Sequence, residues 1–156
     1  MSKILITGGA GFIGFHLANK LSDSDNEVHI LDNFSRAVKD SELNNLANNV
    51  RIIDENLLDE NIFKKLDRNY DYIYHLAALL GVKNVLKSPY QVLDKNISLL
   101  KNTIIVSQNQ KNLERLIFSS TSEVYAGTLQ YYGLAFPTKE NTPLTITNLN
   151  EARSTY

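Results

Sequence analysis

A glycine-rich segment near the N-terminus has a spacing that suits phosphate binding. It reads Gly8-Gly9-Ala10-Gly11-Phe12-Ile13-Gly14 and directly follows the apolar run Ile4-Leu5-Ile6. The early glycines permit a tight turn, Gly11 lets the backbone approach a pyrophosphate, and Gly14 lets a helix lie close to the strand. The start of that helix offers free N–H groups and a partial positive charge to phosphate oxygens. The segment therefore predicts a diphosphate site with these contact residues: Gly8, Gly11, Phe12, Ile13 and Gly14.

A carboxylate follows where the adenosine ribose of a dinucleotide would lie. Asp32 ends the second apolar run and is followed by Asn33, about 20 positions after Gly11, as a ribose-binding acid requires. A carboxylate there would accept bonds from ribose hydroxyls and repel the 2′-phosphate of NADP. Arg36 would favour NADP if it paired with that phosphate, or it is a solvated loop residue. The pattern favours NAD over NADP, with Asp32 and Asn33 in the site, and the alternative is that Asp32 only caps a loop.

A second polar segment follows the last apolar run. Ser119-Ser120-Thr121-Ser122-Glu123 would bring several hydroxyls and a carboxylate to the carboxyl edge of a sheet. Chemistry in α/β proteins concentrates at this edge, beside the expected nicotinamide. The segment is therefore a candidate catalytic site.

Five short apolar or β-branched runs must position these residues. They occupy residues 3–7, 27–32, 50–54, 70–76 and 113–120. Each run is nearly continuous in apolar character, which is typical of strands buried on both faces of a parallel sheet. Helical segments at 12–21, 39–48, 60–67 and 89–110 would cross over between them. The sequence predicts a doubly wound α/β fold of the Rossmann type, with strand order 3-2-1-4-5.

Two helices are marked well enough to predict their inward faces. In the first, Ile13, Leu17 and Leu21 share one face and are expected to pack on the sheet. The last helix begins at Ser88-Pro89, an N-cap followed by a proline at the first helical position. Its expected inward residues include Leu93, Leu100 and Ile104. Residues 126–149 are predicted to form a loop before a new helix near Asn150.

Composition narrows the class of protein. The 156 residues are 43% hydrophobic and 21% charged, and the formal net charge is -1. This balance predicts one globular domain over residues 1–156 and argues against binding to nucleic acid or to an anionic membrane. The chain has no cysteine, so disulfides, thiolate nucleophiles and cysteine-based metal sites are excluded, and no metal site is expected. The run Ile4-Leu5-Ile6 is too short for a signal peptide or a membrane span, and we expect a cytoplasmic protein.

The motifs together resemble the extended short-chain dehydrogenase/reductase family, in particular its NAD-dependent nucleotide-sugar epimerases, dehydratases and decarboxylases, which are isomerases and lyases. The resemblance spans nearly the whole chain. It rests on Thr7-Gly8-Gly9-Ala10-Gly11-Phe12-Ile13-Gly14, Leu31-Asp32-Asn33, His75-Leu76-Ala77-Ala78, Asn96, Ser119-Ser120-Thr121-Ser122-Glu123-Val124-Tyr125 and Arg153-Ser154-Thr155-Tyr156.

The resemblance implies further cofactor contacts. The segment that ends the fourth strand would let the small residues Ala77 and Ala78 lie against the cofactor, and Leu76 of the same segment is added to the site. Asn56 and Leu57 match positions near the adenine, where the family often has Asp-Ile. Asn96 would support the active-site backbone beside the cofactor. His75 is expected to be structural, because the sequence shows neither a partner nor a pocket for a catalytic histidine.

The resemblance also implies catalytic roles. Thr121 would hydrogen-bond the sugar hydroxyl being oxidised, and Tyr156 would take its proton. An unperturbed tyrosine is a poor base at neutral pH, and the family supplies a lysine four residues later that favours the phenolate. The sequence stops at Tyr156, before that lysine, the last strands and the substrate lobe. We expect an N-terminal fragment that does not turn over alone and a full-length protein that is an active homodimer.

The segment after the fifth strand indicates which subclass of this family the chain is most similar to. Glucose 4,6-dehydratases usually carry Thr-Asp-Glu, and here Ser122 replaces the aspartate that protonates the departing hydroxyl. Thr121-Ser122-Glu123 is more similar to uronic-acid decarboxylases, mannose dehydratases and some epimerases, with Glu123 as a second acid or base, or only as a loop cap. Two other functions stay open: a non-catalytic NAD-binding module and an NADP-dependent carbonyl reductase.

Overall fold

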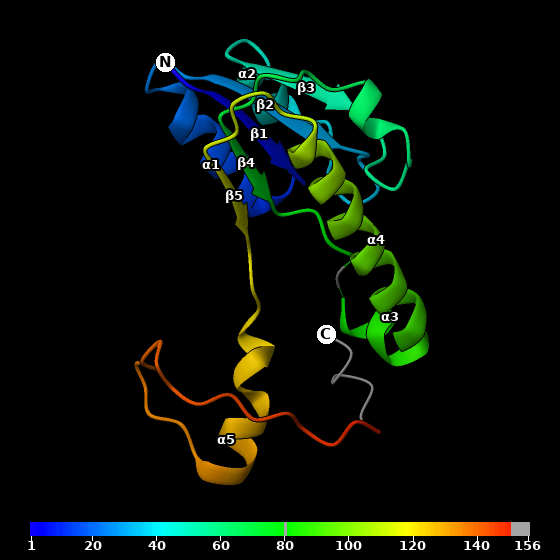
Figure 1. Ribbon diagram of the computed structural model, residues 1–156, viewed down its shortest axis with the longest axis vertical. Coiled ribbons are helices and arrows are strands. Elements are labelled where there is room, and N and C mark those ends of the chain that lie inside the picture. The colour runs from blue at the N-terminus through cyan, green and yellow to red at the C-terminus, as the bar shows by residue number, and fades with distance from the viewer. Residues whose placement is uncertain (80, 151–156) are drawn as a thin grey trace. The chain divides into compact units, whose positions relative to one another are not determined.

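The computed structural model describes residues 1–79 and 81–150, and it contains a five-stranded sheet with helices packed against it (Figure 1). The strands are all parallel and lie in the order β3-β2-β1-β4-β5, which confirms the predicted topology. In chain order the elements are β1 (Lys3–Thr7), α1 (Phe12–Ser22), β2 (Glu27–Asp32), α2 (Ser41–Leu46), β3 (Val50–Asp54), a 3-10 turn (Ile62–Lys64), β4 (Tyr72–His75), α3 (Val82–Lys87), α4 (Pro89–Gln108), β5 (Arg115–Phe118), a second 3-10 turn (Ser122–Tyr125) and α5 (Ala126–Tyr132).

Contacts group the chain into two compact units. The first contains Met1–Ala78 and Asn96–Ser119, and therefore all five strands. The second contains Leu79–Lys95 and the described part of Ser120–Tyr156. The boundary between the units falls within α4. The glycine-rich turn and Asp32 belong to the first unit, whereas Thr121, Ser122 and Glu123 belong to the second.

The register aligns the carboxyl ends of the central strands. Thr7, the last residue of β1, pairs with Leu31 on one side and with His75, the last residue of β4, on the other. Asp32 at the end of β2 pairs with Asp54 at the end of β3. The loops that follow these strands therefore leave the sheet along one edge, where parallel α/β sheets bind ligands.

The inner strands β1 and β2 are buried on both faces, as their continuous apolar runs predict, whereas the edge strand β5 is not. Successive residues of a strand point to opposite faces, so Ile4, Ile6, Val28 and Ile30 pack with Ala18 of α1 and with Leu43 and Leu46 of α2. Leu5, Leu31, Ile53 and Ile73 pack on the other face with Leu99 and Val106 of α4. These two layers fix the positions of the loops at the carboxyl edge (Figure 1).

The predicted inward faces of α1 and α4 are partly wrong. In α1 the buried residues are Gly14 and Ala18, while Ile13 is 67% exposed, because the helix approaches the sheet through small residues. In α4, Leu93 and Ile104 are exposed. The buried face of α4 instead carries Val92, Leu99, Asn102, Thr103 and Val106. The polar residues on that face bond buried partners, so apolar periodicity alone did not reveal it.

The segment predicted as a loop over residues 126–149 begins with a helix, so that prediction is wrong at its start. In α5, Thr128 donates to the carbonyl of Pro143 at 2.7 Å and accepts from the N–H of Thr145 at 3.1 Å. A side chain at Gly127 would collide with the Thr145 carbonyl. These tertiary contacts, rather than apolar periodicity, hold the helix. The predicted helix near Asn150 falls on residues 151–156, outside the described residues.

Among the described residues, no helix has both the length and the apolar character needed to cross a bilayer.

Candidate cofactor-binding site

The glycine-rich turn closes tightly at the end of β1. Gly8 has φ +70°, a left-handed conformation that favours glycine. Its N–H donates to the carbonyl of Leu31 on β2 at 2.8 Å, and its own carbonyl accepts from the N–H of Gly11 at 3.2 Å. These bonds turn the chain from the strand directly into α1.

Packing makes glycine necessary at Gly8, Gly9 and Gly14 of the turn, and Gly11 is different. A Cβ on Gly8 would lie 2.7 Å from the backbone nitrogen of Ala77, and one on Gly14 would lie 2.5 Å from the carbonyl oxygen of Gly8. A Cβ on Gly11 would meet only that same carbonyl, at 3.3 Å. The backbone of Gly11 is extended, with φ -73° and ψ 167°, which any residue adopts. A side chain at Gly11 would therefore need only a small shift of that carbonyl, and the fold requires glycine less here than at the other positions, which fits a place reserved for a ligand.

The start of α1 provides the donors that a diphosphate needs. The N–H of Phe15 makes the first α-helical bond, to the carbonyl of Gly11 at 2.8 Å. The N–H groups of Phe12, Ile13 and Gly14 precede that bond and belong to the helix end that anions bind. Gly11 is the N-cap residue and provides no side-chain cap. The geometry thus fits the diphosphate part of NAD.

Asp32 lies against the turn, as predicted. Its Oδ2 accepts from the N–H of Ala10 at 3.1 Å, and its Oδ1 accepts from the N–H of Phe34 at 2.9 Å. Both carboxylate oxygens are therefore held in place, and each keeps a lone pair for a ribose hydroxyl. Asn33 is exposed next to it and accepts from the N–H of Ser35 at 3.1 Å.

The segment after β4 meets the glycine-rich turn. The N–H of Leu76 donates to the carbonyl of Thr7 at 3.0 Å, and the backbone of Ala77 lies directly against Gly8. Leu76 and Ala77 are half-buried, whereas Ala78 is exposed. The structure thus brings Leu76 and Ala77 to the point between β1 and β4 where the strand order reverses, and where dinucleotides cross such sheets.

His75 is buried beneath this crossing point, with 3% of its surface exposed. Its Nδ1 lies 2.8 Å from the hydroxyl of Thr7 and 3.0 Å from the hydroxyl of Thr103 on α4. Burial lowers the pKa of His75 to about 4. A neutral imidazole bonded to two threonines fits the expected structural role. The sequence reasoning did not identify Thr7 and Thr103 as its partners, although Thr7 stands next to it in the predicted sheet.

The burial of His75 makes stability depend on pH. The unfolded chain has the ordinary histidine pKa of 6.5, so it takes up a proton before the folded chain does as pH falls towards 4. Stability is therefore fully present above pH 6.5 and decreases below it. Between pH 7 and pH 4.5, we expect the unfolding free energy of His75→Asn to fall by about 2 kcal/mol less than that of the wild type. Denaturant unfolding at several pH values measures this loss.

His16→Asn, at an exposed position of α1, is the control and should keep the wild-type pH dependence. Burial also lowers the pKa of His29, so part of the slope should survive in the His75 variant. An identical slope in wild type and His75→Asn would contradict the assignment.

The residues expected near the adenine lie in the loop after β3. Asn56 is exposed, and its Oδ1 accepts from the N–H of Leu58 at 3.0 Å. The side chain of Leu57 is buried in the core, so only its backbone can face a ligand. Its carbonyl accepts from the Nδ2 of Asn102 on α4 at 2.8 Å, a contact that the sequence reasoning missed. Asn96 lies half-buried earlier on α4.

The candidate catalytic segment belongs to the second unit. Thr121 is half-buried and caps the 3-10 turn Ser122–Tyr125, accepting from the N–H of Glu123 at 3.3 Å. This leaves the hydroxyl proton of Thr121 able to donate. Ser122 is exposed and Glu123 is half-buried. Tyr156, the predicted base, lies outside the described residues, so its position relative to this segment stays a prediction.

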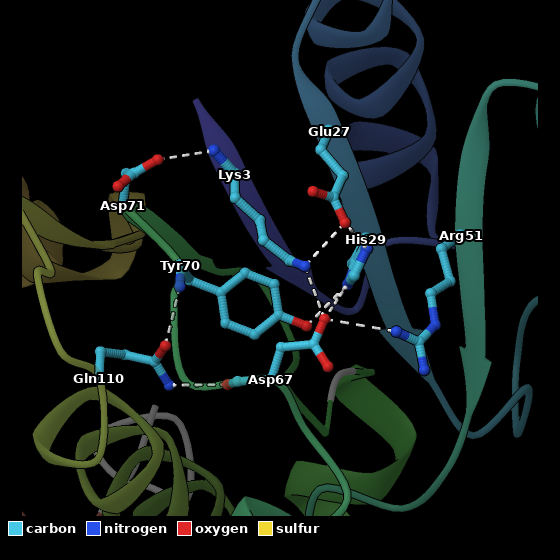
Figure 2. Close-up of polar contacts among 8 residues, drawn as sticks. All are labelled: Lys3, Glu27, His29, Arg51, Asp67, Tyr70, Asp71 and Gln110. Carbon is cyan, nitrogen blue, oxygen red and sulfur yellow. Dashed lines mark hydrogen bonds and ion pairs between the residues drawn. The ribbon is translucent and has the colours of Figure 1, made fainter. Parts of the chain in front are cut away.

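A polar cluster occupies the opposite, amino edge of the sheet (Figure 2). The Lys3 ammonium lies 2.7 Å from both Glu27 and Asp67, and His29 bonds Glu27 at 3.0 Å and the hydroxyl of Tyr70 at 2.7 Å. Burial lowers the pKa of Lys3, but its bonds to Asp67 and Glu27 outweigh this and raise the pKa overall. The same bonds to Lys3 lower the pKa of Glu27 and of Asp67.

Glu27, His29 and Asp67 of this cluster have ligand atoms close enough together to hold a metal ion. The Lys3 ammonium already bridges the two carboxylates, and Arg51 pairs with Asp67 at 3.4 Å. A recess of about 340 Å³ beside the cluster is lined by Met1, Ser2, Lys3, Glu27, Asn69, Asp71 and Asn112. The recess therefore does not include Asp32 or any residue of the glycine-rich turn. The paired charges give the cluster a structural role.

Comparison with known proteins agrees with this geometry. The sequence profile of the family described as "NAD dependent epimerase/dehydratase family" matches residues 4–152. UDP-N-acetyl-alpha-D-glucosaminuronate decarboxylase from Bacillus cytotoxicus is 40% identical over 123 residues, which are 79% of this chain and 37% of that protein.

Solved structures show the same likeness. The UDP-N-acetylglucosamine 4-epimerase from Methanobrevibacter ruminantium M1, in complex with UDP-N-acetylmuramic acid, matches with a TM-score of 0.75 and 36% identity, over 92% of this chain and 44% of that one. The UDP-glucose 4-epimerase from Bifidobacterium longum, in complex with NAD+ and UDP, matches with a TM-score of 0.78 and 25% identity, over 99% and 46%. The chain thus spans less than half the length of these relatives.

Proposed function

Because the chain belongs to the NAD-dependent epimerase/dehydratase family, we propose that it forms the NAD-binding part of an enzyme that acts on a nucleotide-linked sugar by transient oxidation. The observation that carries the proposal is the arrangement of the glycine-rich turn and Asp32. The turn presents the start of α1, and Asp32 is fixed against it by the N–H of Ala10 at 3.1 Å. This is the pair of groups that a dinucleotide's diphosphate and ribose require.

Different residues would bind different parts of NAD. The N–H groups at the start of α1, from Phe12 to Gly14, would hold the diphosphate. Asp32 would accept from the adenosine ribose and disfavour a 2′-phosphate. Leu76 and Ala77 would line the crossing point between β1 and β4. When bound, NAD supplies a reversible acceptor for hydride.

The proposed chemistry is oxidation of a sugar hydroxyl, which enables epimerisation, elimination or decarboxylation. Thr121 would orient that hydroxyl, and the phenolate of Tyr156 would accept its proton. Ser122 and Glu123 would lie close to the reacting sugar, with Glu123 as a second acid or base. The likeness to a uronic-acid decarboxylase and to 4-epimerases, reported above, supports this range of reactions.

The role of Thr121 gives a direct test of the proposal. In the complete product of the gene that encodes this chain, we expect Thr121→Val to lower turnover of the nucleotide sugar about tenfold, since it removes one hydrogen bond in the reacting complex. Thr121→Ser keeps the hydroxyl and should restore most of the activity. The assay follows conversion of a panel of UDP- and dTDP-sugars by chromatography, with and without NAD.

Other outcomes of that assay would identify the other functions. Tight NAD binding without conversion of any nucleotide sugar would support a non-catalytic NAD-binding module. NADPH-dependent reduction of small carbonyls would support a carbonyl reductase. The proposal also includes a cytoplasmic homodimer, for which the exposed Ile97 and Ile104 on α4 offer apolar surface. Light scattering of the purified protein would measure its mass in solution.

A further inference from the structure

We propose that Asn102 of α4 is a positioning residue for the adenine end of the NAD site, because its amide holds the loop 55–59 after β3. The inference rests on the proposed function, since it takes NAD as the ligand. It concerns a residue that touches no part of the predicted diphosphate or ribose site. Its effect would pass through the loop backbone.

The amide of Asn102 is buried and directed at that loop. Asn102 is 5% exposed, and its Nδ2 donates to the carbonyl of Leu57 at 2.8 Å and lies 3.5 Å from the carbonyl of Asp59. Leu57 packs in the same core cluster as Leu99 and Val106 of α4. Buried amides in proteins are normally bonded, and losing such a donor leaves a buried carbonyl without a partner. Asn102 therefore fixes the middle of the loop to the helix.

The start of the loop is fixed to Asp32. The N–H of Glu55 donates to the backbone carbonyl of Asp32 at 3.2 Å. Between the two anchors the loop is held by its own bonds, from the N–H of Leu58 to Asn56 Oδ1 at 3.0 Å and from the N–H of Asp59 to the Asn56 carbonyl at 2.9 Å. A short loop with two anchors has a defined position relative to Asp32. Loss of Asn102 would release one anchor.

The order of the strands places the adenine beside this loop. The diphosphate site follows β1, and the ribose carboxylate ends β2. The next strand in the sheet is β3, whose last residue, Asp54, pairs with Asp32. A dinucleotide that extends from the turn past Asp32 therefore reaches the residues that follow Asp54. The backbone of Asn56 and Leu57 would form one wall of the adenine site.

The test compares two fragments of the cofactor by calorimetry at a temperature well below unfolding. AMP reports on the adenine end, and inorganic pyrophosphate reports on the glycine-rich turn alone. Leucine is nearly equal in size to asparagine, and we expect Asn102→Leu to lower the affinity for AMP at least about fivefold, as loss of a buried hydrogen bond predicts. Pyrophosphate affinity should change less than about twofold. A purely structural role would lower the melting temperature and leave the AMP affinity of the folded protein unchanged.

Gln110 offers a matched control. It lies just after α4, and its side-chain amide also joins the end of this helix to a loop, but at the amino edge of the sheet. The amide accepts from the N–H of Tyr70 at 2.9 Å and donates to the carbonyl of Asp67 at 3.2 Å. Gln110→Met should destabilise the chain without changing either affinity.

A second variant covers the case in which Asn102→Leu fails to fold. Asn102→Ser is smaller and still a donor but too short to reach the loop, so the same selective loss of AMP is expected. Unchanged AMP affinity in either folded variant would overturn the inference. Wild-type protein that binds neither AMP nor NAD would instead overturn the proposed function.

Discussion

Gly11→Asp should lower the affinity for NAD more than about 100-fold, because several charge-assisted bonds to the diphosphate would be lost. The melting temperature should change only slightly, because a new N-cap at the start of α1 offsets a tight contact of the added side chain. Gly11 has extended backbone, and an added Cβ would meet only the carbonyl of Gly8. Aspartate is also a preferred N-cap, and α1 has no side-chain cap. The substitution should therefore cost the fold little, while its carboxylate would occupy the site of the diphosphate and repel the diphosphate charge.

Calorimetry with NAD and thermal unfolding of the same samples test this prediction. Asn19→Asp adds the same charge at an exposed position near the other end of α1, and it should leave NAD affinity within about threefold, because screening weakens distant charges. Gly11→Asp protein that binds NAD as wild type does would show that the diphosphate lies elsewhere. A large fall in melting temperature would contradict the reading that Gly11 serves the ligand rather than the fold.

Asp32→Ala should lower the affinity for NAD about 100-fold, because two charge-assisted bonds to the ribose are lost. It should lower the affinity for NADP much less, since the carboxylate that repels the 2′-phosphate is gone. Asp32→Asn should keep the affinity for NAD within about tenfold of wild type, because an amide still bonds hydroxyl groups. Titration of each variant with both cofactors gives the ratio of affinities. An additional Arg36→Ala substitution would show whether that arginine binds the 2′-phosphate.

Asp54 provides the matched control for Asp32. It occupies the paired position at the end of β3, and its carboxylate bonds Lys39 at 2.6 Å. Asp54→Ala should leave the preference for NAD over NADP unchanged. If Asp54→Ala and Asp32→Ala altered that preference equally, a general effect of charge would replace the assigned role of Asp32.

The fold and the turn were predictable because local and global signals agree there. The five continuous apolar runs gave the strands and their order, and the predicted spans of the first three match the structure. Glycine spacing identified both the tight turn at Gly8 and the close packing at Gly14. The ends of the strands were less predictable, since the fourth and fifth strands are shorter than the apolar runs that predicted them.

The polar interior was not predictable in the same way. Asn102 and Thr103 face inward on α4, yet a helical pattern assigns polar residues to the solvent side. Their inward position depends on partners distant in sequence, the Leu57 carbonyl and His75. Ile13 was assigned to the core by periodicity but lies exposed at the start of α1, where ligand is expected. Such exceptions to the pattern mark the places where the structure serves the site.

The most direct test of the account is an NMR titration of the protein with NAD. The central claim is that the diphosphate binds the N–H groups at the start of α1 beside Asp32. We predict that the backbone amide signals of Phe12, Ile13 and Gly14 shift most and saturate together. Absence of binding, or shifts centred on Lys3 and Asp67 at the opposite edge while these three amides stay unchanged, would contradict the claim.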